Sequence, residues 1–333
     1  MTSRGLATRD SRPRVGQTGT VTTSTIPHGK TARRLEWAHL PPHIRAEVER
    51  HCGAPVTVAE SQTAGFTPGF ASVLTCADGS RHFVKAASLK AQRLFAESYR
   101  EEARKLAALP PTAPAARLEW IHDADDWFVL GLEYVESRQP QRPWRRADLD
   151  GVLDALELVA DVLTPPPATL ALDPIATEFA DFPGYWDRLR TTRSDLGHLE
   201  EAAALAARFP EVCGGDTLVH TDVRDDNILI RADGTALLCD WNWPSVGAAW
   251  LDTVFVMIGP RGDGLDVESV LSERRLTCDL PAETIDAVLA LLAGYFFRQC
   301  EEPVPPTSPH LRDAQRWQGD VCWAWLCERR RWG

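Results

Sequence analysis

The 333-residue sequence lacks three features, each of which would assign it to a particular class of protein. Its longest strongly apolar run, residues 287–297, is too short to span a bilayer. No segment near its start has the apolar region of a secretory signal. None of its eight cysteines forms a Cys-x-x-Cys pair. These absences predict a cytoplasmic protein without a membrane partner, whose cysteines are reduced, buried thiols rather than a disulfide framework or a zinc site.

Positive charge is also scarce over most of the chain. Residues 139–333 contain 18 Lys and Arg against 32 Asp and Glu, a net charge of −14 within a chain total of −11. Because affinity for nucleic acid comes from neutralised phosphates, this balance predicts no nucleic-acid partner. An acidic surface attracts cationic small molecules, although many acidic surfaces serve only to keep a protein soluble.

Composition divides the chain into three parts. Residues 1–40 are rich in Thr, Ser, Gly and Arg, and we expect them to form a flexible N-terminal tail. Residues 41–137 contain strand patterns and one helical pattern, and the polar residues 138–146, with two prolines, mark a lobe boundary. Residues 138–333 have mostly helical patterns. The sequence therefore predicts an α+β fold, in which a small antiparallel sheet with one helix precedes a larger, mainly helical lobe.

Periodicity and turn residues locate the individual elements. In the first lobe, strands are expected at residues 56–58, 72–75, 82–85 and 127–135. Residues 90–109 have helical spacing, and Glu102 lies on the otherwise apolar face, where a carboxylate needs a partner. Further helices are expected at residues 148–163, 195–209, 284–298 and 311–330.

One segment of the second lobe departs from the helical pattern and is rich in polar residues. A strand is followed by a polar loop, which begins near Asp222 and ends at Asn227, and then by a hairpin of residues 228–239. Because the hairpin returns the chain beside its start, Asp240 should lie next to Asn227. Carboxylate and amide oxygens, together with phosphates and water, suit Mg²⁺. This segment therefore predicts a magnesium site.

A lysine and a glutamate of the first lobe complete a set of groups suited to phosphoryl transfer. That reaction requires a metal clamp, a cation on the phosphates and a carboxylate that orients the acceptor. Lys85 ends a predicted strand and can supply the cation, while Glu102 can hold Lys85 in place. The loop from Gly65 to Gly69 can cover the phosphates, since backbone N–H groups approach closely where Cβ atoms are missing.

The two polar motifs are VHTDVRDDNILI, with the pattern His-x-Asp-x-x-x-x-Asn, and LLCDWNWPSVGAAWLD, whose aspartate follows that asparagine by 13 residues. Together they resemble the motifs of the aminoglycoside phosphotransferase family, within the protein-kinase-like superfamily of small-molecule kinases. The GFTPGF loop, the FVKA strand, the REEARKLAAL helix and the VLGLEYV segment stand in the family's order. The resemblance implies a two-lobed, kinase-like fold with ATP and Mg²⁺ as cofactors.

The resemblance also implies a role for each matching residue. Asp222 is similar to the catalytic carboxylate, and Asn227 and Asp240 to the Mg²⁺ ligands. Lys85 is similar to the lysine that contacts the ATP phosphates, and Glu102 to its ion-pair partner.

The resemblance implies roles for three further positions, whose side chains have a less direct part in the chemistry. Glu133 and Val135 stand where the family's hinge backbone binds adenine, and Arg224 stands where protein kinases place a lysine near the γ-phosphate. The chain departs from protein kinases in lacking a complete G-x-G-x-x-G loop, and Trp241 and Asn242 follow the metal-binding aspartate instead of Phe-Gly. The latter departure is usual in small-molecule kinases and argues against a protein kinase.

The implied reaction is transfer of the γ-phosphoryl group of ATP to a hydroxyl of a small molecule. Because the second lobe is acidic, an aminoglycoside or another cationic antibiotic is the first acceptor to consider, and the protein would then confer antibiotic resistance. A metabolic kinase for an amino alcohol, sugar or amino acid is an alternative. A nucleotide-binding protein without transfer activity is another, although the intact set of Lys85, Asp222, Asn227 and Asp240 argues against it. The sequence leaves the oligomeric state open.

Overall fold

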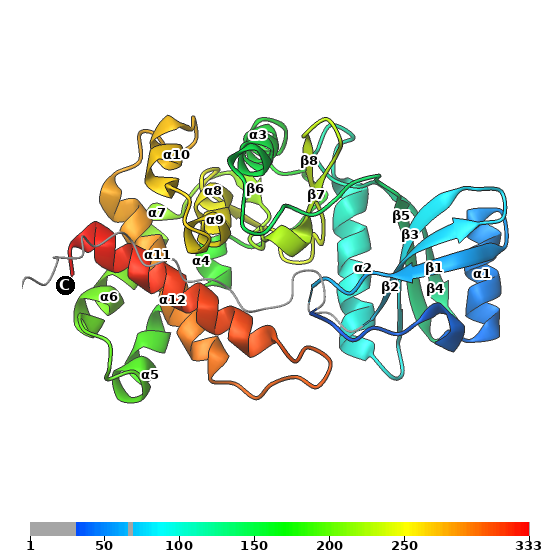
Figure 1. The fold of residues 1–333 in the computed structure, drawn as a ribbon, viewed down its shortest axis with the longest axis horizontal. Coiled ribbons are helices and arrows are strands. Elements are labelled where there is room, and N and C mark those ends of the chain that lie inside the picture. Colours follow the sequence, from blue (N-terminus) through cyan, green and yellow to red (C-terminus); the bar gives the residue numbers. More distant parts are fainter. Residues whose placement is uncertain (1–30, 66–68, 333) are drawn as a thin grey trace, which may run out of the picture.

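The fold was examined in a computed structural model, which describes residues 31–65 and 69–332. The chain forms a sheet-containing lobe and a mainly helical lobe, which lie next to each other along the longest axis (Figure 1). The predicted α+β architecture with two lobes is therefore confirmed. Most of the predicted N-terminal tail, residues 1–30, lies outside the described residues.

The small lobe is built on a five-stranded antiparallel sheet with the order β1-β2-β3-β5-β4. Its strands are β1 (Val56–Ser61), β2 (Phe70–Cys76), β3 (Arg81–Ser88), β4 (Leu118–Ala124) and β5 (Trp127–Glu133). The sequence analysis did not predict β4. This strand lies at the sheet edge, and its side chains alternate between exposed and partly exposed, so its apolar signal is weak.

Two helices cover opposite faces of this sheet, α1 (Pro42–Cys52) and α2 (Arg93–Ala108). Val84 and Ala86 of β3 pack in one apolar cluster with α1, whereas Ala87 packs in another cluster with α2. Because successive strand residues point to opposite faces, Lys85 lies on the α2 face. The sequence predicted α2 but not α1, so the lobe has one helix more than expected.

Residues 31–40, which composition grouped with the tail, instead pack against the small lobe. Leu40 is buried in the cluster between α1 and the sheet. The backbone N–H groups of Thr31 and Ala32 both donate to the carbonyl of Thr63, each at 3.0 Å. This short segment is therefore part of the folded lobe.

The large lobe consists mainly of helices. They are α3 (Arg146–Val162), α4 (Ile175–Glu178), α5 (Tyr185–Thr192), α6 (Leu199–Ala206), α7 (Phe209–Val212), α8 (Leu251–Val256), α9 (Ile258–Gly262), α10 (Val267–Glu273), α11 (Ala282–Cys300) and α12 (Leu311–Arg330). Two short strand pairs accompany them: β6 (Thr217–Val219) with β9 (Ser245–Gly247), and β7 (Ile228–Ile230) with β8 (Ala236–Leu238). The predicted hairpin is thus confirmed as β7 and β8.

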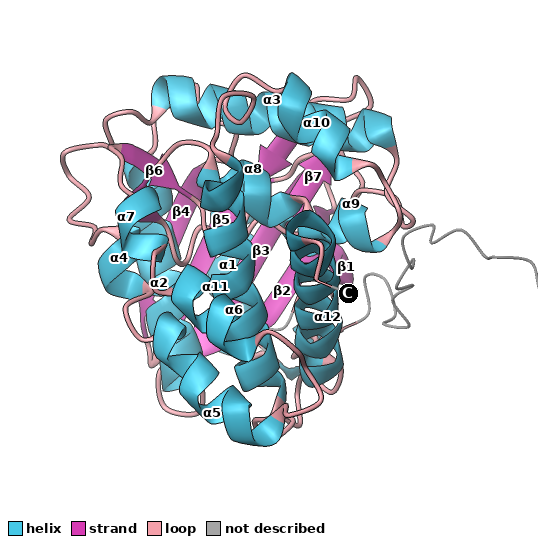
Figure 2. Cartoon of the chain, turned by 90° about the vertical axis from the view of Figure 1, so that its left-hand side faces the viewer, coloured by secondary structure: helices cyan, strands magenta, loops and turns pink. Residues whose placement is uncertain are grey.

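The apolar run noted in the sequence forms the core of this lobe. Residues 284–294 of α11 are all buried, and α11 packs against both α12 and α6 (Figure 2). Among the helices of the described residues, none is both long and apolar enough to cross a membrane. All eight cysteines are free thiols. Five are buried, as predicted, but the prediction of burial is wrong for Cys278, which is exposed, and for Cys239 and Cys327, which are partly exposed.

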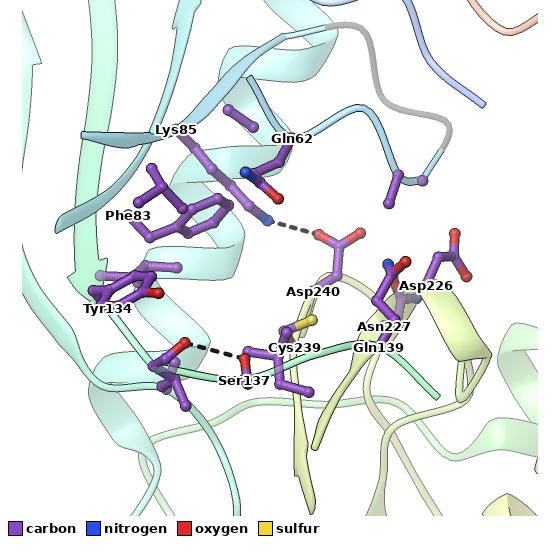
Figure 3. Close-up of a pocket in the computed structure, with 18 of the residues that line it drawn as sticks. Gln62, Phe83, Lys85, Tyr134, Ser137, Gln139, Asp226, Asn227, Cys239 and Asp240 are labelled. Carbon is purple, nitrogen blue, oxygen red and sulfur yellow. Dashed lines mark hydrogen bonds and ion pairs between the residues drawn. The ribbon is translucent and has the colours of Figure 1, made fainter. Parts of the chain in front are cut away.

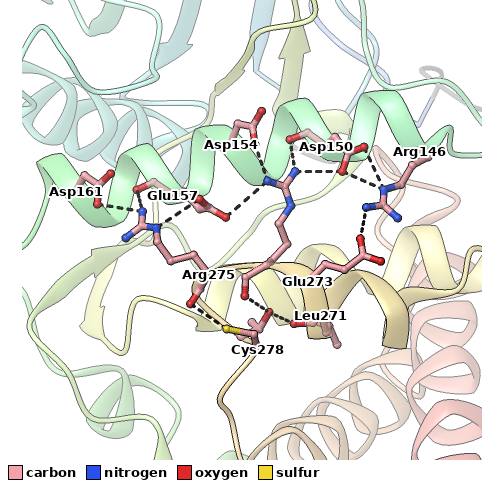
Figure 4. Close-up of polar contacts among 11 residues, drawn as sticks. Arg146, Asp150, Asp154, Glu157, Asp161, Leu271, Glu273, Arg275 and Cys278 are labelled. Atoms are coloured by element: carbon pink, nitrogen blue, oxygen red, sulfur yellow. Dashed lines mark hydrogen bonds and ion pairs between the residues drawn. The ribbon is translucent and has the colours of Figure 1, made fainter.

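A ladder of ion pairs attaches the segment after α10 to the surface of α3 (Figure 4). Arg274 contacts Asp154 at 2.6 Å, and Arg275 contacts Asp161 at 3.0 Å. Arg146 of α3 completes the ladder by contacting Glu273 at 2.8 Å. We call these contacts the α3 ladder.

Candidate active site

A pocket of about 480 Å³ opens between the two lobes (Figure 3). The sheet contributes Phe83 and Lys85, the segment after β5 contributes Tyr134 and Ser137, and the end of the β7–β8 hairpin contributes Asp240. The volume falls within the range of pockets that bind small molecules and cofactors.

Lys85 is held between two carboxylates from different lobes. Its Nζ donates to Oε1 and Oε2 of Glu102 at 2.7 and 2.8 Å, and to Oδ1 of Asp240 at 2.9 Å. Lys85 meets Glu102 because its place on β3 turns it toward α2 and Glu102 lies on the buried face of that helix. The expected contact between Lys85 and Glu102 is therefore present, and Asp240 is a second partner of Lys85. We call these three residues the cleft triad.

Burial and the mutual attraction of these charges determine their ionisation. Burial by itself would lower the pKa of Lys85, but the carboxylates of Asp240 and Glu102 outweigh burial and raise it. Burial likewise opposes ionisation of Asp240, yet Lys85 holds the pKa of Asp240 below its ordinary value. Burial raises the pKa of Glu102, which shares one lysine with a second carboxylate. Asp240 is thus kept ionised, as a metal ligand must be.

The polar loop holds Asp222 next to Asn227. Nδ2 of Asn227 donates to the carbonyl oxygen and to Oδ2 of Asp222, at 2.9 and 3.0 Å. Arg224 donates to Oδ1 of Asp222 and also to Asp226 at 3.0 Å. Because Nδ2 of Asn227 is engaged with Asp222, its Oδ1 is the side-chain atom suited to bind a metal ion.

Buried groups behind the loop determine its shape. Asp252 accepts hydrogen bonds from the backbone N–H groups of His220 at 2.6 Å and Thr221 at 2.9 Å. The His220 ring contacts the carbonyl of Cys239 through Nε2 and accepts from the N–H of Asp222 through Nδ1. Burial lowers the pKa of His220, so the ring is neutral with both nitrogens engaged. His220 therefore supports the loop through both of its ring nitrogens.

Two residues of the site have an unusual backbone conformation. Thr221 and Asp240 both have a φ of 67°, a region that residues other than glycine rarely occupy. Such conformations persist only where the surrounding contacts impose them, and they are common at functional sites.

Of the two predicted loop glycines, Gly65 lines the pocket and Gly69 does not, while residues 66–68 between them lie outside the described residues. Gly65 has a φ of 81°, which favours glycine. A Cβ atom on Gly69 would lie 2.4 Å from the Tyr99 hydroxyl oxygen. Glycine at position 69 therefore allows the loop to pack closely on α2.

Glu133 and Val135, predicted from the hinge motif, both line the pocket. The Glu133 side chain turns away to accept a hydrogen bond from Arg117 Nε at 2.9 Å. The carbonyl of Val135 accepts from the hydroxyl of Ser137 at 3.0 Å. The Glu133 contact engages its carboxylate, whereas the Val135 contact engages a main-chain oxygen. That the main chain at these positions binds adenine stays a prediction.

Among the pocket residues that sequence reasoning did not predict are two with charged side chains, Arg34 and Asp226. Arg34 Nη2 donates to the carbonyl of Ala64 at 2.8 Å, and its Nε is buried without a hydrogen-bond partner among the described residues. Arg34 belongs to the segment assigned to the tail, where no pattern marks it as functional. Asp226 stands inside the loop motif, and its burial, which raises its pKa, could not be read from composition.

No family model matches the sequence, and no curated protein matches it significantly. The structure, in contrast, resembles solved small-molecule kinases. Spectinomycin phosphotransferase, in complex with ADP and spectinomycin, has a TM-score of 0.57 and 11% identity, over 86% of this chain and 98% of that chain. An aminoglycoside phosphotransferase mutant bound to ADP and hygromycin B has a TM-score of 0.55 and 11% identity, over 86% and 98%.

A choline kinase from Streptococcus pneumoniae resembles the chain equally well, with a TM-score of 0.55 and 14% identity over 85% of this chain and 99% of that chain. The chain has the fold of these small-molecule kinases. The kinase-like fold expected from the motifs is thus confirmed over most of the chain. The pocket that contains the cleft triad lies where the two lobes of this fold meet.

Proposed function

We propose that the protein is a phosphotransferase that depends on ATP and Mg²⁺ and transfers the γ-phosphoryl group to a hydroxyl of a small molecule. One observation carries this proposal. Lys85 and Asp240 are 155 residues apart in the chain, yet their side chains lie 2.9 Å apart in one pocket, with Asn227 beside them. A cation for the phosphates and oxygen ligands for a metal thus meet where the reaction requires them.

The pocket residues suit the two cofactors. The main chain at Glu133 and Val135 would bind adenine, and Lys85 would bind the phosphates beneath the loop that contains Gly65 and Gly69. Arg34, which also lines the pocket, would add a second cation near the phosphates. Two of the similar solved structures contain ADP, which supports the choice of nucleotide.

The oxygen atoms available at the site fit Mg²⁺. Among the described residues, the hydrogen bonds to the Asp240 carboxylate, from Lys85 and Asn242, both end on Oδ1 and leave Oδ2 able to bind a metal. Oδ1 of Asn227 would be the second ligand. Bound there, Mg²⁺ would neutralise charge on the phosphates, and the hard oxygen ligands match its preference.

Asp222 would orient the acceptor hydroxyl and accept its proton. Asn227 and Arg224 hold the two carboxylate oxygens of Asp222 in the free protein. An acceptor hydroxyl would take the place of the Arg224 contact, and Arg224 could then turn toward the γ-phosphate. A carboxylate in this position contributes through orientation and proton transfer.

For the acceptor, we propose a cationic small molecule with a free hydroxyl. The net charge of −14 in residues 139–333 favours a cation. Spectinomycin and hygromycin B are bound by two of the similar proteins, and a third is a choline kinase. An aminoglycoside acceptor would make the protein a cytoplasmic antibiotic-resistance enzyme, whereas an amino-alcohol acceptor would make it a metabolic kinase.

The test is a phosphorylation screen of the purified protein with ATP and Mg²⁺. The acceptors would include aminoglycosides, spectinomycin, choline and neutral sugars, and ADP release and product mass would be measured. We expect turnover of at least one cationic acceptor, which chelation of Mg²⁺ and the Asp222→Asn substitution both abolish. Tight ATP binding without transfer to any acceptor would instead indicate a nucleotide-binding protein of this fold.

A further inference from the structure

A cluster of metal-binding side chains lies in the small lobe, away from the active site. Cys52 ends α1, Cys76 ends β2, and His82 is the second residue of β3. One ligand atom from each of these residues lies within 4.8 Å of the other two. His82 alternates with Lys85 along β3, so the cluster faces α1, on the opposite side of the sheet from the cleft triad.

The hydrogen bonds around His82 determine which ring nitrogen carries its proton. The Ser80 hydroxyl donates to Oδ1 of Asp78 at 2.7 Å, so its oxygen can only accept from Nε2 of His82, which lies 3.2 Å away. In the neutral ring this leaves Nδ1 with a free lone pair. Nδ1 is buried and makes no hydrogen bond to the described residues, and Oε2 of Glu119 lies 3.5 Å from it.

The hydrogen bonds from His82 to Ser80 and from Ser80 to Asp78 are typical of a metal-binding histidine. Histidine ligands almost always donate their second ring N–H to an oxygen acceptor, which fixes the tautomer and points the free lone pair at the metal. Here Ser80 is that acceptor, and Asp78 in turn orients Ser80. A buried nitrogen lone pair without a donor is otherwise unfavourable, because buried polar atoms need partners.

The two thiols complete a donor set for a borderline-soft cation. Both are buried, and burial together with the neighbouring Cys76 raises the pKa of Cys52 to about 12. A metal ion would displace the proton of each thiol that it binds. Two thiolates with an imidazole are ligands typical of Zn²⁺.

We propose that Cys52, Cys76 and His82 bind one zinc ion, with the Glu119 carboxylate as the fourth ligand. Zinc bonds of 2.0–2.3 Å place the ligand atoms of a tetrahedral site about 3.3–3.8 Å apart, so the observed cluster has to contract by about 1 Å. Sequence analysis argued against a zinc site because no Cys-x-x-Cys pair is present. The ligands proposed here are separated by 24 and 6 residues and meet only through the sheet. The ion would clamp the end of α1 to the β2–β3 hairpin.

The experiment uses the full-length chain, purified without an affinity tag that binds metals, and measures its metal content after equilibration with Zn²⁺. We expect one zinc per chain, and Co²⁺ in its place should give a thiolate-to-cobalt charge-transfer band. Cys76→Ser and His82→Gln should each lose the bound metal. Cys278→Ser is the matched control, because Cys278 is exposed and lies in the other lobe, and it should keep the metal. Chelation should lower the melting temperature of the wild type but not that of Cys76→Ser.

Three results would overturn the proposal. The first is a wild-type chain that binds no stoichiometric zinc when its thiols are reduced. The second is a Cys76→Ser chain that retains zinc. The third is a Cys52–Cys76 disulfide, seen as a loss of two hydrogens in the mass, in a chain that binds no zinc after reduction. The wild-type measurement stands even where a variant fails to fold, and it is independent of phosphotransferase activity.

Discussion

The cleft triad and the α3 ladder consist of the same kinds of ion pair at similar distances, but water surrounds only one of them. The Lys85–Glu102 contact of 2.7 Å joins side chains that are 10% and 1% exposed. The Arg275–Asp161 contact of 3.0 Å joins side chains that are 53% and 59% exposed. Because water screens the charges of the ladder, burial rather than distance determines what each contact contributes.

This difference in burial distinguishes the ion pairs of the candidate active site from those on the protein surface. An exposed ion pair contributes about 0–1 kcal/mol and leaves its side chains free to move. A buried pair is strongly destabilising to break, since the remaining charge has no water to replace its partner. Burial thus makes the positions of Lys85 and Glu102 obligatory, while Asp240, whose side chain is 27% exposed, faces the pocket. Fixed positions of this kind are what the proposed roles toward phosphates and a metal would require.

The largest effect is expected at Asp240, the member of the triad that we propose as a Mg²⁺ ligand. Asp240→Ala removes both a proposed Mg²⁺ ligand and a partner of Lys85, so Mg²⁺-dependent nucleotide binding should be lost. Titration calorimetry with ATP, with and without Mg²⁺, measures this directly. Asp233→Ala, at the exposed turn of the same hairpin, is the control and should bind normally. Unaltered metal dependence in Asp240→Ala would contradict the ligand assignment.

A second substitution separates catalysis from binding within the same pocket. Asp222→Ala should lower kcat by about 10²–10⁴ while ATP affinity changes little, because proton transfer and orientation act in the transition state. Steady-state kinetics and a separate ATP titration measure the two quantities. An unchanged kcat would remove Asp222 from the proposed role.

Two adjacent glutamates of α2 provide the sharpest test of burial. Glu102 is buried in the triad, whereas Glu101 is half-exposed and paired with Arg104. Glu102→Ala should lower the free energy of unfolding by about 3 kcal/mol, near the lower end for a broken buried pair because Asp240 remains beside Lys85. Glu101→Ala should lower it by less than about 1 kcal/mol. Urea unfolding of both variants measures these two free energies. Equal losses of stability in the two variants would refute the conclusion that burial determines the contribution of each ion pair.

The smallest effect is expected in the α3 ladder. Arg275→Ala should change the free energy of unfolding by about 0–1 kcal/mol, and the change should vanish near 1 M salt, where the Debye length is about 3 Å. Urea unfolding at low and high salt measures it. A loss above about 2 kcal/mol that persists in salt would show that the ladder behaves like the buried triad.

Strong local patterns made much of the fold predictable. The helix predicted at residues 311–330 matches α12, and the hairpin after Asn227 forms as expected. The exposed edge strand β4 and the short helix α1 gave weaker signals and were missed. Arg34 was missed for a different reason, because its place beside Ala64 depends on a backbone path that composition cannot show.

The sequence by itself determined the order of the motifs, the alternation of β3 and the buried face of α2, because these depend on neighbours within a few residues. Only the tertiary structure decided that Lys85 meets Asp240 across 155 residues, and that His82 turns from the same strand toward Cys52 and Cys76. The physical reason is that a strand's period separates its two faces locally, whereas the partner on each face is selected by the packing of the whole lobe.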